Sequence, residues 1–146
     1  MFYNPYIDKD GRRTQPTVQQ PKSLNLPKEY VDLAQKHISE LKLMNNKITS
    51  TKLRNIFGLF ADLYNQLLRA DGKELTDDMI AVLRSARVRI VYECGRDNAT
   101  KTFVEKTNIL EYLQSIDKSR EKFICFYHYM EALVAYGRYE GLTNDR

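Results

Sequence analysis

Apolar residues recur at intervals of three and four along most of the chain after residue 26. This spacing places them on one face of an α-helix, and no segment alternates over the length of a strand. Capping residues such as Thr49 and Thr76 and the turn Asp71-Gly72 divide the pattern into separate helices. The predicted helices cover residues 27–43, 49–70, 76–95, 97–116 in one or two pieces, and 120–140. The predicted fold is all-α, a compact bundle of about five helices joined by short links.

The first 26 residues differ from the rest in composition. They hold three of the four prolines, Pro5, Pro16 and Pro21, and show no helical or strand period. This is typical of an extended arm, either free or laid on a neighbour. A chain of 146 residues is expected to form one domain. We therefore predict an extended N-terminal arm at 1–26 and a helical bundle domain at 27–146.

The segment 120–140 is apolar on most of its circumference. A helix of that kind lies at the centre of a bundle or is covered by another chain. Its tyrosines, among them Tyr127, Tyr129 and Tyr139, are therefore expected in the core and at interfaces rather than stacked on bases.

Composition narrows the class of protein. The net charge of +4, from 23 basic and 19 acidic side chains, permits a nucleic-acid partner without requiring one. The amino terminus lacks the apolar core of a signal peptide, and no run reaches the roughly 18 apolar residues of a membrane span. We expect a cytoplasmic protein with no membrane contact. Cys94 and Cys125 are expected to be buried, reduced thiols.

The sequence offers little for catalysis. His37 falls on the apolar stripe of the first helix and is expected to be a core histidine with its hydrogen bonds satisfied. His128 and Cys125 lie three residues apart, but with Cys94 they provide too few ligands for a zinc site. There is no glycine-rich phosphate loop. We predict no catalytic residues, no metal, no cofactor and no enzymatic activity.

Arginines concentrate in the stretch RSARVRIVYECGR at 84–96. On a helical wheel Arg87 lies beside the core positions and Arg84 borders them, whereas Arg89 and Arg96 point away. We predict a structural ion pair between Arg87 and Glu131, since a charge near a core needs a partner. Arg84 either forms an internal ion pair or contacts RNA. Arg89 and Arg96 are either solvated or contact phosphates, to which guanidinium groups bind in a bidentate manner.

A second basic cluster lies at the predicted start of the helix 49–70, in TSTKLRN. Lys52 and Arg54 fall in its first turn, where cations oppose the helix dipole. Either this small cost is tolerated at an exposed end, or a bound anion removes the conflict.

Three segments together resemble one family. They are ITSTKLRNIF at 48–57, RIVYECGR at 89–96 and FICFYHYMEALVAYGRYEG at 123–141. In this order they resemble the small α-helical subunit of type III-A CRISPR–Cas effector (Csm) complexes, over about residues 48–142. The arm and the first helix are not covered by this resemblance.

The resemblance implies a non-catalytic inner-filament subunit acting in antiviral defence. Its copies would stack along the duplex of guide (crRNA) and target RNA, beside the backbone and large subunits of the complex. The implied RNA-binding residues are Lys52, Arg54, Arg89 and Arg96, with Arg84 a weaker match. The alternative is a helical scaffold subunit that binds proteins and makes no direct contact with nucleic acid.

Overall fold

The computed structural model describes residues 9–12 and 24–143. Within them the chain forms six helices and no named strand; one isolated antiparallel bridge joins Glu74 to Ser119. The helices are α1 (Tyr30–Leu43), α2 (Ser50–Leu68), α3 (Asp77–Arg96), α4 (Asn98–Thr107), α5 (Ile109–Ser115) and α6 (Arg120–Tyr139). The all-α prediction is confirmed, and the predicted helix at 97–116 is two helices. Most of the predicted arm lies outside the described residues.

Side-chain caps set most of the helix starts. Thr49, Thr76, Asp97 and Ser119 each accept a hydrogen bond from the backbone N–H three residues later. Between α4 and α5, Asn108 adopts a left-handed conformation (φ 56°), which asparagine tolerates better than most residues. These breaks fall where the sequence places them. The exception is α1, which begins at Tyr30 rather than Pro27, because its first i→i−4 bond runs from Leu33 to Glu29.

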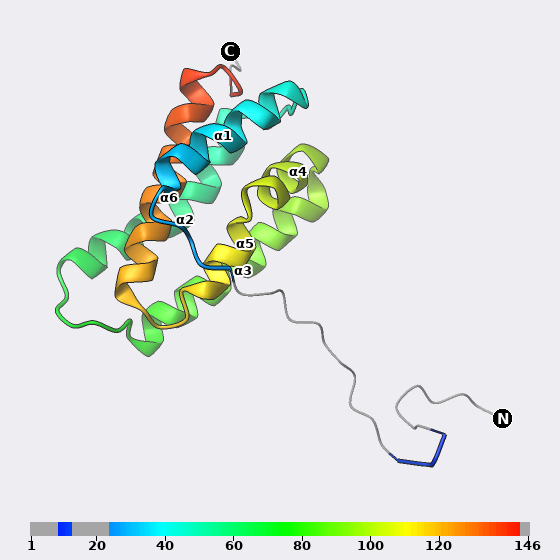
Figure 1. Cartoon of the computed structure of the whole chain (residues 1–146). Helices are drawn as coiled ribbons and strands as arrows, with labels where there is room; N and C mark the ends of the chain where they lie inside the picture. Colours follow the sequence, from blue (N-terminus) through cyan, green and yellow to red (C-terminus); the bar gives the residue numbers. More distant parts are fainter. Residues whose placement is uncertain (1–8, 13–23, 144–146) are drawn as a thin grey trace.

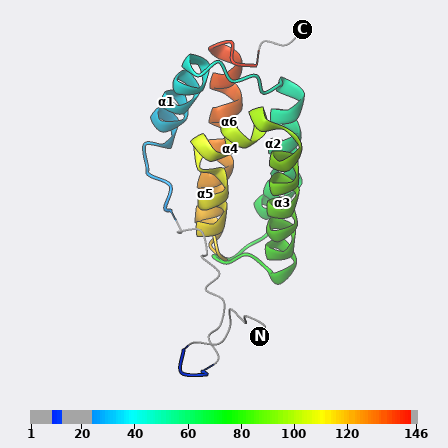
Figure 2. The same ribbon diagram turned by 90° about the vertical axis from the view of Figure 1, so that its right-hand side faces the viewer.

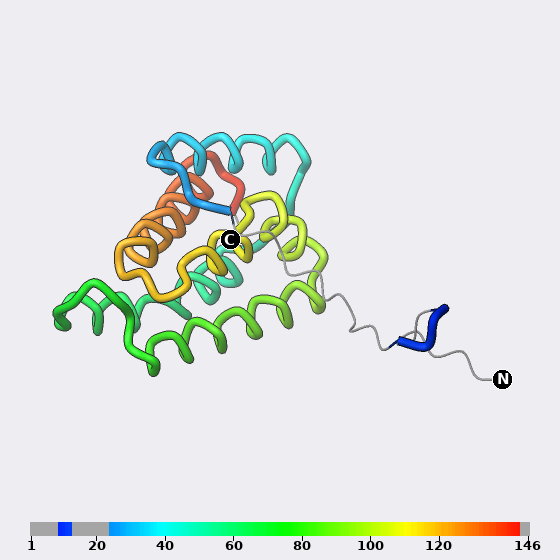
Figure 3. The backbone as a smooth tube through the Cα atoms, turned by 60° about the horizontal axis from the view of Figure 1, so that its bottom comes forward, coloured from blue at the N-terminus to red at the C-terminus, as the bar shows by residue number. Residues whose placement is uncertain are grey.

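Helix α6 packs against α1, α2 and α5 (Figure 1). Helix α3 runs alongside α2 and also contacts α4 and α5 (Figure 2). Helices α1 and α3 lie on opposite sides of the bundle, with α5 between them (Figure 3). Helices of the same chain therefore cover much of the apolar surface of α6.

The core confirms the expected place of the central aromatics. Phe60 and Phe126 pack edge to face with ring centroids 5.1 Å apart. Tyr129 is fully buried, and its hydroxyl donates to the backbone oxygen of Thr107 at 2.8 Å. Tyr139 instead is 82% exposed. No helix in the described part of the chain is long and apolar enough to cross a membrane.

Candidate nucleic-acid interface

A cleft of about 470 Å³ opens between the first half of α2 and the second half of α3. Basic residues of both helices line it: Lys52 and Arg54 from α2, and Arg89 from α3. Glu93 and Thr100 complete its polar wall, and Ile56, Leu59 and Ile90 supply apolar surface. The two basic clusters of the sequence therefore meet at one cleft.

The rigidity of the cleft comes from the helices that carry it. Ile56 and Ile90, each in the middle of a wall, belong to the buried core. The basic side chains therefore project from backbone that cannot move without opening the core. A preformed charged surface of this kind loses less conformational entropy when it binds a ligand.

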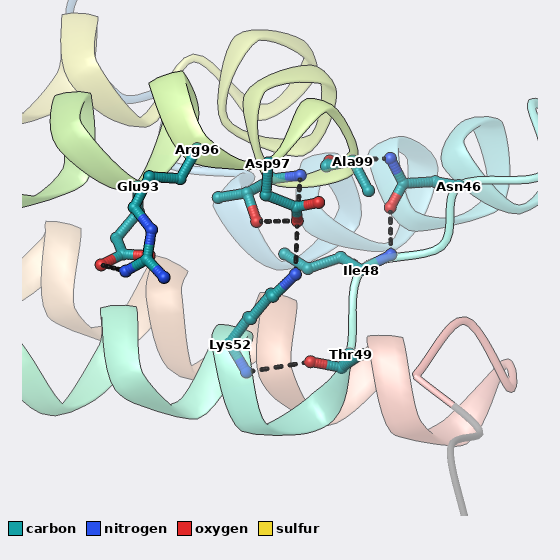
Figure 4. Close-up of polar contacts among 9 residues, drawn as sticks. Asn46, Ile48, Thr49, Lys52, Glu93, Arg96, Asp97 and Ala99 are labelled. Atoms are coloured by element: carbon teal, nitrogen blue, oxygen red, sulfur yellow. Dashed lines mark hydrogen bonds and ion pairs between the residues drawn. The ribbon is translucent and has the colours of Figure 1, made fainter.

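Lys52 is held by an internal carboxylate. Its ammonium group lies 2.9 Å from Oδ2 of Asp97, at the α3–α4 corner (Figure 4). The same oxygen accepts hydrogen bonds from the backbone N–H and the hydroxyl of Thr100, at 3.2 and 2.6 Å. The Thr100 hydroxyl, and after it Lys52, hold the pKa of Asp97 below its ordinary value. Asp97 therefore provides an anion for Lys52 within the chain, and the assignment of Lys52 to RNA stays a prediction.

A second set of polar contacts fixes the loop that enters α2. The Asn46 side chain donates to the backbone oxygen of Ala99 and accepts from the N–H of Ile48, both at 3.0 Å (Figure 4). This amide joins the loop before α2 to the first turn of α4. Together with the Lys52–Asp97 pair it fixes the position of α2 relative to the α3–α4 corner.

Arg89 and Arg96 flank Glu93 on the outer side of α3. Their guanidinium nitrogens lie 3.3 and 3.6 Å from Oε1 of Glu93. Both arginine side chains are 62% exposed, so these pairs are weak and readily exchanged. Arg96 also lies over the ring of Tyr92, 5.6 Å from its centroid. The outward orientation predicted for Arg89, Tyr92 and Arg96 is confirmed.

Arg54 differs from the other three cations. It is exposed and lines the cleft, and it forms no salt bridge with any residue that the structure describes. The guanidinium group of Arg54 is therefore open to an external anion without breaking an internal pair.

The predicted ion pair between Arg87 and Glu131 is wrong. Glu131 is 62% exposed on α6 and lies 3.8 Å from Nδ1 of His128. Arg87 lines a small pocket with Arg84, Gln114 and Asp117 instead. Helix α5 contacts both α3 and α6, and it is α5 that meets this side of α3. The structure thus separates Arg84 from the cleft, and its assignment to RNA stays a prediction.

The histidine and cysteine predictions need adjustment. Cys94 and Cys125 are free thiols, as expected, but both are half-buried rather than buried. Burial raises the pKa of Cys94 and lowers that of His37. Neither ring nitrogen of His37 has a hydrogen-bond partner among the described residues. The prediction that the hydrogen bonds of this histidine are satisfied is therefore wrong. In the same part of the chain, no three His, Cys, Asp or Glu side chains are grouped as metal ligands.

Sequence reasoning overlooked three residues of this region. Glu93 could have been found, because residues three and four apart on a helix are neighbours and Arg89 and Arg96 occupy those positions. Asp97 could not have been found as the partner of Lys52, because no local pattern connects the two residues. Gly58, on the cleft wall, gave no signal in the apolar pattern.

Comparison with known proteins decides the family. The profile described as Csm2 Type III-A matches residues 25–142, which covers all six helices. The chain belongs to the Csm2 family of type III-A. This confirms the resemblance drawn from three motifs and extends it over α1, which those motifs left out.

Individual Csm2 proteins match over most of their length. The "CRISPR system Cms protein Csm2" of Streptococcus thermophilus is 38% identical over 115 residues, 77% of this chain and 91% of that protein. The protein of the same name from Mycobacterium tuberculosis is 38% identical over 93 residues, 64% of this chain and 75% of its own. The protein of the same name from Enterococcus italicus is 34% identical over 96 residues, which are 64% of this chain and 69% of that protein.

Proposed function

We propose that this Csm2-family chain is a non-catalytic small subunit of a type III-A CRISPR ribonucleoprotein that contacts the backbone of the guide RNA–target RNA duplex through the α2–α3 cleft. The family match and the printed name of its relatives, a CRISPR system protein, support membership of such a complex. Its partners would be the guide and target RNA, the backbone and large subunits, and further copies of itself.

The observation that carries the proposal is the convergence of Arg54 and Arg89. They come from different helices, are exposed, and line the same cleft. Guanidinium groups are suited to phosphate because their planar N–H groups match its oxygens. Contacts to the sugar–phosphate backbone need not read sequence, because the guide reads its target by base pairing.

The charge of the cleft fits a subunit that binds weakly alone. Three cations, Lys52, Arg54 and Arg89, and one carboxylate, Glu93, line the cleft, which leaves two net positive charges. Such a surface gains little affinity from one contact. Several copies along one duplex would add their contacts, since each is held near its binding site by its neighbours.

The test is binding of target RNA by the assembled ribonucleoprotein over a series of salt concentrations. The double variant Arg54→Ala, Arg89→Ala removes the two cleft arginines. We expect weaker binding and a smaller slope of log affinity against log salt concentration. The slope should fall by about two for each engaged subunit, since each lost phosphate contact lowers it by about one.

Arg84→Ala with Arg87→Ala is the matched control. It removes the same charge from α3, on the side away from the cleft. We expect this control to change affinity and slope much less than the cleft variant does. Equal losses in the two variants would contradict the assignment to the cleft and would keep Arg84 as an RNA contact.

A second function, a scaffold subunit without nucleic-acid contact, is favoured by one observation. The outer face of α3 exposes Val88, Val91 and Tyr92, at 69%, 52% and 57%. Exposed apolar side chains grouped on one face are typical of protein contacts. If the arginine variants leave RNA affinity unchanged while Val88→Asp prevents incorporation into the complex, the scaffold function replaces the proposed one.

A further inference from the structure

Gly58 occupies an unfavourable position for a glycine. It lies in the middle of α2 and is exposed. Glycine is among the least favourable residues inside a helix, because it gains the most backbone freedom on unfolding. Two features of a fold would account for a glycine in the middle of a helix: a strained backbone, or a neighbour that leaves no room for a side chain.

Neither feature exists within the described part of the chain. Gly58 is not among the residues with positive φ, so its backbone suits any L-amino acid. A Cβ atom placed on it would meet no heavy atom within 4 Å outside its own helix and its chain neighbours. Gly137 in α6 shows the contrast, because there a Cβ would touch the side chains of Leu53, Ile38 and Thr143 at 3.6–3.8 Å.

The place of Gly58 in the cleft suggests an external reason. Arg54 precedes it by one turn on α2, and Arg89 reaches the cleft from α3. A polyanion bound by both guanidinium groups would lie against the α2 wall of the cleft, to which Gly58 belongs. There the missing side chain leaves bare helix backbone, so the ligand can approach more closely than at any residue with a Cβ.

We propose that Gly58 is the point where the RNA sugar–phosphate backbone approaches the α2 helix most closely. This rests on the proposed function, since it requires that the cleft binds RNA. RNA is favoured over a protein segment because two arginines line the same cleft as Gly58, and one of them, Arg54, forms no salt bridge among the described residues. Gly58 acts through shape: it admits the phosphates to within reach of both guanidinium groups.

The experiment substitutes Gly58 in the assembled ribonucleoprotein. Gly58→Ala should raise the melting temperature of the isolated subunit, since alanine is the better helix former. It should also weaken target-RNA binding about fivefold or more, because the added methyl group occupies the space of the ligand. Gly58→Leu should weaken binding further. The salt slope should change less than in Arg54→Ala, Arg89→Ala, because no charge is removed.

Gly95→Ala is the matched control. Gly95 is also exposed and helical, its Cβ would likewise meet nothing within 4 Å, and it does not line the cleft. It should raise the melting temperature and leave RNA affinity unchanged, which separates helix propensity from steric exclusion.

The outcomes separate this inference from the function it rests on. If both Gly58 variants bind RNA normally while Arg54→Ala, Arg89→Ala does not, the close approach is refuted and the proposed function stands. If the arginine and glycine variants all bind normally, both fail. If Gly58→Leu prevents incorporation into the complex while Gly58→Ala is incorporated and binds RNA normally, a protein partner covers this part of α2 and the inference is overturned.

Discussion

Replacing Asp97 by alanine is the sharpest test of how the α3–α4 corner holds the cleft together. The Oδ2 atom of Asp97 takes part in three interactions. It accepts hydrogen bonds from the N–H and the hydroxyl of Thr100, and it pairs with the ammonium group of Lys52. Alanine removes all three. Asparagine is sterically similar and also a good N-cap, so it keeps the hydrogen bonds and loses only the charge.

The three interactions can be weighed separately. Loss of an N-cap costs about 1 kcal/mol. The Thr100 side chain is 1% exposed, so leaving its hydroxyl unpaired costs about 1 kcal/mol more. The side chains of Lys52 and Asp97 are 44% and 27% exposed, and an ion pair so accessible to solvent contributes only about 0.5 kcal/mol. We expect Asp97→Ala to lower the free energy of unfolding by about 2–3 kcal/mol, and Asp97→Asn by about 1 kcal/mol or less.

Urea unfolding followed by circular dichroism measures these differences, with thermal melts as a second readout. A loss of 1 kcal/mol corresponds to a fall in Tm of about 4 °C for a chain of this length. Lys52→Met should match Asp97→Asn, because each removes only the ion pair. If Asp97→Ala and Asp97→Asn destabilise equally, the cap and the Thr100 hydroxyl are not the main contribution, and the reasoning is wrong.

The same residue predicts a dependence on pH. The pKa of Asp97 is lowered in the folded chain, so its carboxylate stabilises the fold above its unfolded pKa of about 3.9. That contribution is lost as the pH falls through the lower, folded pKa. The native chain should therefore lose more stability below about pH 4 than Asp97→Asn does. Parallel pH profiles for the two would contradict the lowered pKa.

Two further predictions concern the interior. Tyr129→Phe should lower the free energy of unfolding by about 1–2 kcal/mol, because the fully buried hydroxyl donates to the backbone oxygen of Thr107, which would be left unpaired; no change in urea unfolding would show that this oxygen finds another donor. Cys94 should react with iodoacetamide at pH 8 more slowly than a cysteine in a peptide, because burial, and after it Glu105, raises the pKa of its thiol and leaves less thiolate; a rate equal to that of the peptide would refute the shift.

The sequence alone determined the features that depend on neighbours within one helical turn. The caps at Thr49 and Thr76 follow from side chains that bond their own backbone. The apolar stripes predict the helices because burial at intervals of three and four leaves a period that can be read directly. The outward direction of Arg89 and Arg96 follows from the same period.

Only the tertiary structure decided which of these surfaces meet. Lys52 and Asp97 are distant in sequence, and no local pattern predicts that the corner after α3 supplies the carboxylate for the start of α2. The Arg87–Glu131 pair failed because a wheel gives the direction of a side chain without saying which helix lies opposite, and α5 occupies that place. The meeting of Arg54, Gly58 and Arg89 at one cleft likewise depends on α2 and α3 packing side by side, which burial of the whole core selects.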